Sequence, residues 1–389
     1  MSLVPSVDLS DFLSEDPRRK QKFINEIGKA FEEIGFVALG GHFLSDQLVD
    51  SLYAEIKEFF NLPEDIKDGY QIEGIGGQRG YTSFGKEHAK GRKEGDLKEF
   101  WHFGQYVEDN DALEKEYPDN VMVKELPKFN AVGKETYKML EKTAKYVLRA
   151  LALHLKLDEF YFDDFIKNGN SILRPIHYPP ITSEPKNAVR AAAHGDINLI
   201  TLLMGAHGKG LQVKNHEGEW VDAIARPDQL MINVGDMLSR LTNNKLLSTI
   251  HQVVNPPREL WGTSRYSVPF FMHPVSEMPL NCLDNCIDEE HPKLYTDITA
   301  GEFLHERLIE LGLIKNLFPD HEPQDAPPEK ENENKIWLQD DPIICKYEKR
   351  KGKPITILEG YTGANEDFKK LAKEIKTKLS VGGSFKDDK

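Results

Sequence analysis

A histidine and an aspartate stand two residues apart at the head of a strongly apolar run. They are His194 and Asp196, in the stretch "AAHGDINLITLLMG" at residues 192–205. In a β-strand, side chains two residues apart point to the same side. An imidazole and a carboxylate at this spacing can therefore aim at one point, as the ligands of a metal ion do.

A second histidine completes a potential metal site in the same part of the chain. His251 lies in "LLSTIHQVV", which is an apolar, strand-like run. Two imidazoles and one carboxylate form a facial triad, which leaves open positions on an octahedral Fe(II) ion for a bidentate co-substrate and O2. Zinc prefers a tetrahedral site with more histidine or cysteine ligands, so we expect iron here.

An arginine and a serine with the same spacing follow the second histidine. Arg265 and Ser267, in "SRYSVPFF", share a strand face. A guanidinium can bind a carboxylate through two charge-assisted hydrogen bonds, and a hydroxyl can add a third. A dicarboxylate anchored by this pair could reach the metal with its other end. Arg258 is the competing anion ligand, although no serine stands two positions after it.

The segments that must position these residues change character near residue 160. Residues 1–160 are predicted to be mainly helical, and residues 161–318 to form a β-core with a closing helix. In the first part, helical spacing of apolar residues predicts helices within 16–35, 44–63 and 126–155. In the second part, short apolar runs alternate with turn signals such as "NHEG", which is typical of a sandwich or barrel.

Residues 74–104, by contrast, are glycine-rich with interleaved aromatic residues, which indicates a long ordered loop. Long loops in compact domains often serve a functional site. The composition of this segment therefore places five of its residues on the substrate side of the pocket: Arg79, Tyr81, Phe84, Trp101 and His102.

The composition of the chain restricts its class and its compartment. It has 389 residues and a net charge of −14, which argues against a protein that binds nucleic acid with its whole surface. No apolar run approaches the roughly 20 residues that span a bilayer. Three cysteines and the absence of a signal-peptide pattern indicate a reducing, cytoplasmic location and no membrane partner.

The ordered motifs H-x-D, a distal histidine and R-x-S resemble those of the Fe(II)/2-oxoglutarate-dependent oxygenases. "HYPP" at 177–180 and "NVGDMLSRLTNNKLLSTIHQVVNPP" are similar to the isopenicillin N synthase-like subgroup, over residues 3–315. The resemblance implies an α+β fold, in which flanking helices surround a double-stranded β-helix, or jelly-roll, core. The family often has Asn two residues before the tyrosine of this motif, where this chain has Ile176.

The same resemblance implies a set of ligands and a reaction. His194, Asp196 and His251 would bind Fe(II), while Arg265, Ser267 and Tyr178 would bind 2-oxoglutarate. The expected reaction couples oxidative decarboxylation of 2-oxoglutarate by O2 to hydroxylation or desaturation of a small molecule. Isopenicillin N synthase itself keeps R-x-S without using 2-oxoglutarate, so an oxidase independent of 2-oxoglutarate is the alternative.

A separate C-terminal part follows a segment rich in Pro, Glu, Asp and Asn at 319–335, which predicts a disordered linker. Residues 336–389, with "LEGY" and "VGGSFKD", resemble the first part of the SUI1 domain of eukaryotic initiation factor 1. That resemblance implies a partial α/β plait and a ribosome-associated function as a further alternative. Its RNA-facing patch would comprise Lys349, Arg350, Lys351 and Lys353.

Overall fold

The computed structural model describes residues 4–75, 77–87, 95–107, 117–185, 188–205, 210–310, 344–350 and 353–359. The chain divides into two units, Met1–Asp325 and Ala326–Lys389, and each is described by itself. The linker predicted at 319–335 lies outside the described residues.

Helices dominate the first half of the chain, as the apolar spacing predicts. Those of the described residues are α1 (Leu9–Phe12), α2 (Pro17–Glu33), α3 (Asp46–Phe60), α4 (Glu64–Asp68), α5 (Pro127–His154), α6 (Asp163–Ile166), α7 (Asp236–Leu241) and α8 (Ala300–Glu310). The two long N-terminal helices begin at capped residues: the Asp16 carboxylate accepts a hydrogen bond from the amide of Arg18, and the Ser45 hydroxyl accepts one from the amide of Leu48.

Short strands make up most of the remaining structure of the first unit. They are β1 (Ser6–Asp8), β2 (Phe36–Gly40), β3 (Gly80–Thr82), β4 (Glu99–Gly104), β5 (Ile172–Leu173), β6 (Ile176–Tyr178), β7 (Ala191–His194), β8 (Ile200–Met204), β9 (Leu211–Lys214), β10 (Trp220–Asp222), β11 (Leu230–Val234), β12 (His251–Val253) and β13 (Arg265–Met272). The predicted hairpin at "NHEG" is present between β9 and β10, which pair antiparallel.

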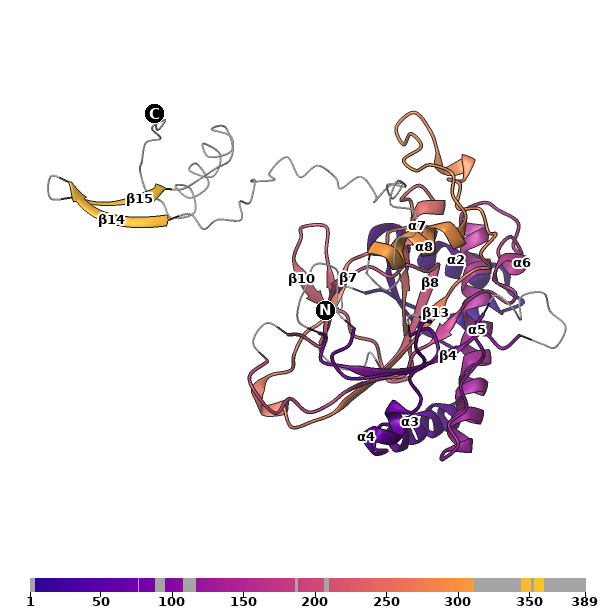
Figure 1. The fold of residues 1–389 in the computed structure, drawn as a ribbon. Coiled ribbons are helices and arrows are strands. Elements are labelled where there is room, and N and C mark those ends of the chain that lie inside the picture. The colour runs from indigo at the N-terminus through magenta and orange to yellow at the C-terminus, as the bar shows by residue number, and fades with distance from the viewer. Residues whose placement is uncertain are drawn as a thin grey trace. The chain divides into compact units, whose positions relative to one another are not determined.

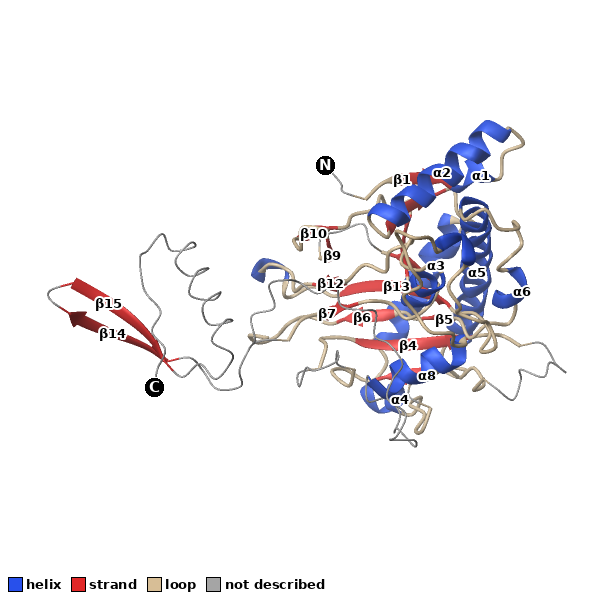
Figure 2. Cartoon of the chain, turned by 90° about the horizontal axis from the view of Figure 1, so that it is seen from above, coloured by secondary structure: helices blue, strands red, loops and turns tan. Residues whose placement is uncertain are grey.

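Two sheets of unequal size form the β-core. The large sheet has the order β1-β2-β11-β8-β13-β5-β4-β3, with β6 joined to β13 and β4, and the small sheet has the order β10-β9-β12-β7. The small sheet and the long helices α3 and α5 flank the large sheet on opposite sides (Figures 1 and 2). This arrangement agrees with the expected double-stranded β-helix core with flanking helices.

Each face of the large sheet buries a different apolar cluster. Its helix-facing side belongs to the main core, in which Val268, Phe270 and Met272 of β13 pack together with α5 residues such as Tyr137. A smaller cluster includes residues of both sheets, among them Ile176 and Val213. Because side chains alternate along each strand, one face of the large sheet packs into the helix-facing core and the other lines the interior between the two sheets.

One prediction about the N-terminal half was wrong. Residues 74–104 are not a continuous loop, because they contain β3 and β4, which pair with each other antiparallel. Strand β4 also pairs with β5 and β6 and thereby joins the large sheet. The glycines and charges around "EFWHFG" mask its strand character in the sequence, whereas pairing on both sides provides the hydrogen bonds that a strand needs.

The second unit contains a two-stranded antiparallel ribbon. Its strands are β14 (Ile344–Arg350) and β15 (Lys353–Glu359), with Arg350 opposite Lys353 in the register. Of the four residues of the predicted RNA-facing patch, Lys349, Arg350 and Lys353 lie at the facing ends of these two strands, and Lys351 is outside the described residues. Among all the described residues, no helix has the length and apolarity needed to cross a membrane.

Candidate metal centre

The two candidate histidines are cross-strand neighbours in the small sheet. His194 ends β7 and His251 begins β12, and the antiparallel register sets these two residues opposite each other. Their ring centroids lie 4.5 Å apart. The convergence that spacing alone could not establish therefore follows from strand pairing, which holds the two imidazoles side by side.

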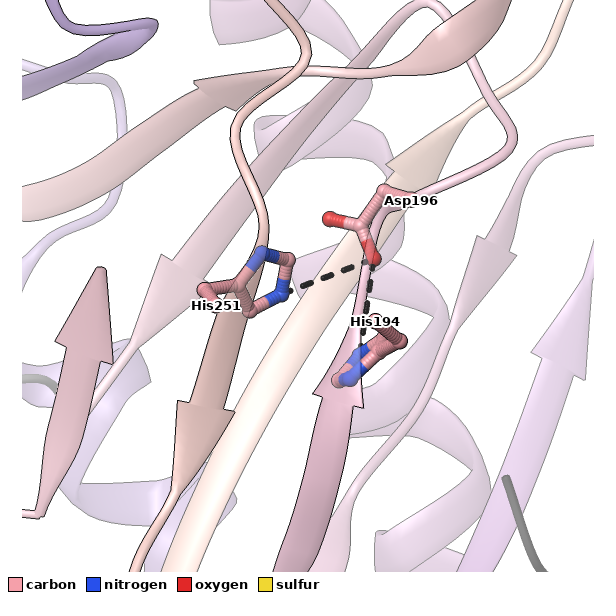
Figure 3. Close-up of side chains that lie close together, drawn as sticks. All are labelled: His194, Asp196 and His251. Atoms are coloured by element: carbon pink, nitrogen blue, oxygen red, sulfur yellow. Dashed lines mark ion pairs between the residues drawn. The ribbon is translucent and has the colours of Figure 1, made fainter. Parts of the chain in front are cut away.

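Asp196 reaches the same point by a different route from the one that the sequence suggested. The expectation that His194 and Asp196 share a strand was wrong, because β7 ends at His194 and β8 begins only at Ile200. Asp196 lies in the connection, whose backbone is held by a hydrogen bond from the amide of Asp236 to the carbonyl of Asp196, 2.7 Å long. The carboxylate of Asp196 still points toward both imidazoles (Figure 3).

Hydrogen bonds fix which ring nitrogen of each histidine faces the aspartate. The Nδ1 atom of His194 donates to the carbonyl of Ala192 at 2.6 Å, and that of His251 donates to the carbonyl of Thr249 at 3.2 Å. A carbonyl can only accept, so Nδ1 carries the proton and Nε2 keeps a lone pair when the ring is neutral. The Nε2 atoms of His194 and His251 lie 4.0 Å and 3.8 Å from Oδ1 of Asp196.

The other oxygen of the aspartate is held by the large sheet. Oδ2 of Asp196 accepts hydrogen bonds from the Thr201 hydroxyl at 2.6 Å and from the Asn233 amide at 2.7 Å. Thr201 and Asn233 are partners in the register between β8 and β11. This arrangement orients the carboxylate and leaves Oδ1 directed at the two Nε2 atoms, as in the outer shell of a metal site.

The pKa values of Asp196 and His194 favour the binding of a cation. Burial would raise the pKa of Asp196, but the two histidines and the bonds from Asn233 and Thr201 outweigh it and keep the pKa below its usual value. The loss of hydration around the imidazole, together with the neighbouring His251, lowers the pKa of His194 to about 4. Asp196 therefore offers an anionic oxygen and His194 a neutral imidazole nitrogen at neutral pH, which are ligands that suit Fe(II).

The three ligand atoms form a compact group, and one of the side chains is open to solvent. They all lie within 4.8 Å of one another. The side chain of His194 is 41% exposed, whereas that of Asp196 is 6% exposed. An ion and a co-substrate could thus approach from the side of His194, while the carboxylate stays buried against the large sheet.

The predicted anion-binding residues lie together on neighbouring strands. Arg265 and Tyr178 are opposite each other in the register of β13 and β6, and Ser267 is opposite Ile176. The Arg265 guanidinium carbon lies 5.5 Å from the centre of the Tyr178 ring. Its buried Nη1 atom has no hydrogen-bond partner among the described residues. A buried, unpaired N–H group of a cation is a strong candidate to bind an anion.

The competing arginine takes no part in this group. Arg258 is exposed in a short 3₁₀ helix, Arg258–Leu260, and its guanidinium lies 5.5 Å from the ring centre of Trp261. Exposure to water removes the energetic need for an anionic partner. The structure therefore favours Arg265 over Arg258 as the anion ligand.

The five predicted substrate-side residues separate into distinct environments. Trp101 and Tyr81 belong to the helix-facing core, where both pack against Phe59. Arg79 is fully buried, and Phe84 is 51% exposed. Only His102 shares a strand face with Phe100, which belongs to the cluster lining the interior between the sheets. Alternation along β4 therefore divides residues that composition alone had grouped together.

His102 belongs to a polar network that the sequence did not reveal. Its Nδ1 donates to the carbonyl of Gly77 at 2.6 Å, and its Nε2 accepts a hydrogen bond from Nε of Arg174 at 2.5 Å. Arg174 also forms an ion pair with Glu87 at 3.3 Å. Burial and the Arg174 charge keep the pKa of His102 well below its usual value. This imidazole is therefore neutral and serves as an acceptor for the guanidinium.

A second unpredicted network anchors the strand that carries Tyr178. The adjacent His177 points to the opposite side, where its Nδ1 contacts Oε1 of Glu99 at 2.7 Å and its Nε2 contacts the Ser264 hydroxyl at 3.0 Å. Glu99 also forms an ion pair with Lys67 at 2.7 Å. These contacts tie β6 to β4, α4 and the start of β13, and so position Tyr178 and Arg265 relative to each other.

Two protein families and a named relative match this chain. Residues 4–125 match the family described as the N-terminal part of the non-haem dioxygenase in morphine synthesis, and residues 169–274 match the 2OG-Fe(II) oxygenase superfamily. The chain is 30% identical to the 2-oxoglutarate-dependent dioxygenase frbA of Dothideomycetidae sp. (strain 11243), over 79% of this chain and 96% of that protein.

Solved structures resemble the chain in the same way. A 2OG-Fe(II) oxygenase family protein from Caulobacter crescentus has a TM-score of 0.73 and 42% identity, covering 80% of this chain and all of that one (100%). A full-length protein of Neurospora crassa, solved in complex with alpha-KG, has a TM-score of 0.69 and 29% identity, covering 78% of this chain and 95% of that one. Both matches extend over nearly the entire length of the relative.

Proposed function

Because this chain belongs to the 2OG-Fe(II) oxygenases, we propose that His194, Asp196 and His251 hold its ferrous ion. The observation that carries the proposal is the convergence of two Nε2 atoms on Oδ1 of Asp196. These three residues supply nitrogen and oxygen ligands from two strands and one connection. A facial set of this composition leaves the remaining coordination positions free for a co-substrate and O2.

The enzyme is an Fe(II)/2-oxoglutarate-dependent oxidoreductase, which couples the oxidative decarboxylation of 2-oxoglutarate to hydroxylation or desaturation of a small molecule. The bound iron supplies the activation of O2, and the protein supplies position and a shielded site. Thr201 and Asn233 keep the Asp196 carboxylate turned toward the ion. The carbonyl groups of Ala192 and Thr249 hold the imidazoles in the tautomer that offers Nε2.

The distal carboxylate of 2-oxoglutarate is assigned to Arg265 and Ser267, beside Tyr178. The unpaired Nη1 of Arg265 supports this assignment, as does the strand position of Ser267, which is 3% exposed. Use of 2-oxoglutarate also distinguishes this chain from the alternative of an oxidase that does not need it, since its relatives carry 2-oxoglutarate in their names. Of the five predicted substrate-side residues, we propose that His102 is the one that faces the interior between the two sheets.

A spectroscopic titration tests the proposed function directly. Anaerobic addition of Fe(II) and 2-oxoglutarate to the full chain is expected to produce a weak visible charge-transfer band, because the keto acid and the ion must share one site. Exposure to O2 should then release succinate, and a screen of amino acids, peptides and small metabolites for faster release would identify the substrate. Absence of the band at saturating ligand would contradict the proposal, and Zn(II) in place of Fe(II) is the control.

A second proposal concerns residues 336–389 and rests on their SUI1-like motifs, supported by the β14–β15 ribbon, whose paired ends carry Lys349, Arg350 and Lys353. We expect the full chain to co-sediment with small ribosomal subunits at low salt, through Lys349, Arg350, Lys351 and Lys353. Lys349→Glu combined with Lys353→Glu should abolish co-sedimentation. The matched control is Lys22→Glu with Lys29→Glu on α2, where both side chains are exposed. Equal sedimentation of the two double variants would contradict this proposal.

A further inference from the structure

We propose that Arg190 is a second cation of the co-substrate pocket and that it binds the distal carboxylate of 2-oxoglutarate together with Arg265. The inference rests on the proposed function and adds a specificity-determining residue to it. Arg190 directly precedes β7, the strand that ends in His194. The metal ligand and the second guanidinium are therefore carried by the same short segment.

Two guanidinium groups surround one aromatic ring in this pocket. The guanidinium carbon of Arg190 lies 5.6 Å from the centre of the Tyr178 ring, and that of Arg265 lies 5.5 Å from it. Tyr178 is 2% exposed and Arg190 is 5% exposed. Burial and the positive charge of Arg265 both lower the pKa of Arg190, so the two cations disfavour each other at this place unless an anion binds between them.

The polar atoms of both arginines are under-satisfied. Nε of Arg190 has no hydrogen-bond partner, and its Nη2 donates only a long bond of 3.4 Å to the carbonyl of Thr263. Nη1 of Arg265 is also without a partner. The charged or titratable groups that influence the pKa of Arg190 are Arg265 and Tyr178, and no carboxylate is among them in the described part of the chain. Burial of unpaired N–H groups on two cations is costly unless an anion arrives to accept their hydrogen bonds.

The contact with the Tyr178 ring does not by itself satisfy the N–H groups of the buried Arg190 guanidinium. Stacking on Tyr178 would stabilise one guanidinium, but it satisfies none of the in-plane N–H groups, which point along the edge of the cation. A carboxylate has two oxygens and can accept from two arginines at once. Arg265, Ser267 and Arg190 would then contact the same carboxylate beside the Tyr178 ring.

The test compares two ligands that differ only in the distal carboxylate. Isothermal titration calorimetry would measure the binding of 2-oxoglutarate and of 2-oxopentanoate to the full chain loaded with Mn(II), which supports binding without turnover. For Arg190→Gln we expect affinity for 2-oxoglutarate to fall about tenfold to hundredfold, the range for loss of a hydrogen bond to a charged group. Affinity for 2-oxopentanoate and for Mn(II) should change less than about twofold, since neither contacts Arg190.

Two further variants make the result decisive. Arg190→Met retains packing on Tyr178 without charge and should behave like Arg190→Gln, while Arg190→Lys should recover part of the affinity. Unchanged binding of 2-oxoglutarate in the uncharged variants, or an equal loss for both ligands, would overturn the inference and leave the proposed function intact. Failure of the unaltered protein to bind 2-oxoglutarate at all would instead overturn the proposed function.

Discussion

Asp196→Ala is expected to abolish succinate release and to weaken metal binding by well over about 100-fold, more than the 10–100-fold that removal of an outer-shell partner typically costs. Asp196 supplies the anionic oxygen of the three-residue cluster, and its Oδ1 atom is the point on which both imidazoles converge. Two neutral nitrogens without a carboxylate retain little affinity for a hard divalent ion.

The measurement needs a control for folding, because Asp196 is also structural. Its removal takes a close acceptor from the Thr201 hydroxyl and from the Asn233 amide and leaves them longer bonds to Asn198 and Val234, so we expect a loss of about 1 kcal/mol for each bond. Asp196→Asn keeps an oxygen acceptor and should melt closer to the unaltered protein, while still failing to bind metal tightly. Asp228→Ala, at a position exposed to solvent, is the matched control. Tight Mn(II) binding by Asp196→Ala would remove Asp196 from the metal site.

The sequence identifies the three residues of the candidate metal site because their chemistry is rare and local. Few explanations exist for a histidine or an aspartate within an apolar run, as at His194, Asp196 and His251. The order of these residues along the chain reduces the possible kinds of site further. Their actual convergence depends on the pairing of β7 with β12, which no local pattern specifies. Helices α2, α3 and α5 could be predicted because the spacing of their apolar residues is a local signal that does not depend on strand pairing.

The residues that surround the proposed ligands could not be identified from the sequence, because their contacts depend on strand register and tertiary packing. Thr201 and Asn233 stand within apolar runs, and only the register of β8 against β11 brings them to the same carboxylate oxygen. Arg190 stands apart from every motif, and tertiary packing alone places it beside Tyr178. In β4, alternation places Trp101 in the core and His102 in a polar network, a division that requires the strand to be recognised first.

Arg265→Ala is expected to raise the KM for 2-oxoglutarate by about 30-fold to several thousand-fold, because truncating one partner of a buried, hydrogen-bonded charge pair costs roughly 2–5 kcal/mol. Metal affinity should remain close to that of the unaltered protein, since Arg265 is not among the residues that could hold the ion. The kcat at saturating 2-oxoglutarate should fall less than kcat/KM, because the lost contacts hold the distal end of the co-substrate in ground state and transition state alike.

Arg258→Ala provides the matched control for Arg265→Ala. Both arginines follow the distal histidine within one connection and strand, and both were candidates to bind the anion on sequence grounds. Arg258 is exposed beside Trp261, so its loss should leave the KM for 2-oxoglutarate within about twofold, as for most surface substitutions. Steady-state succinate release at varied 2-oxoglutarate measures both effects. A large rise in KM for Arg258→Ala with none for Arg265→Ala would reassign the carboxylate to Arg258 and detach R-x-S from the reaction.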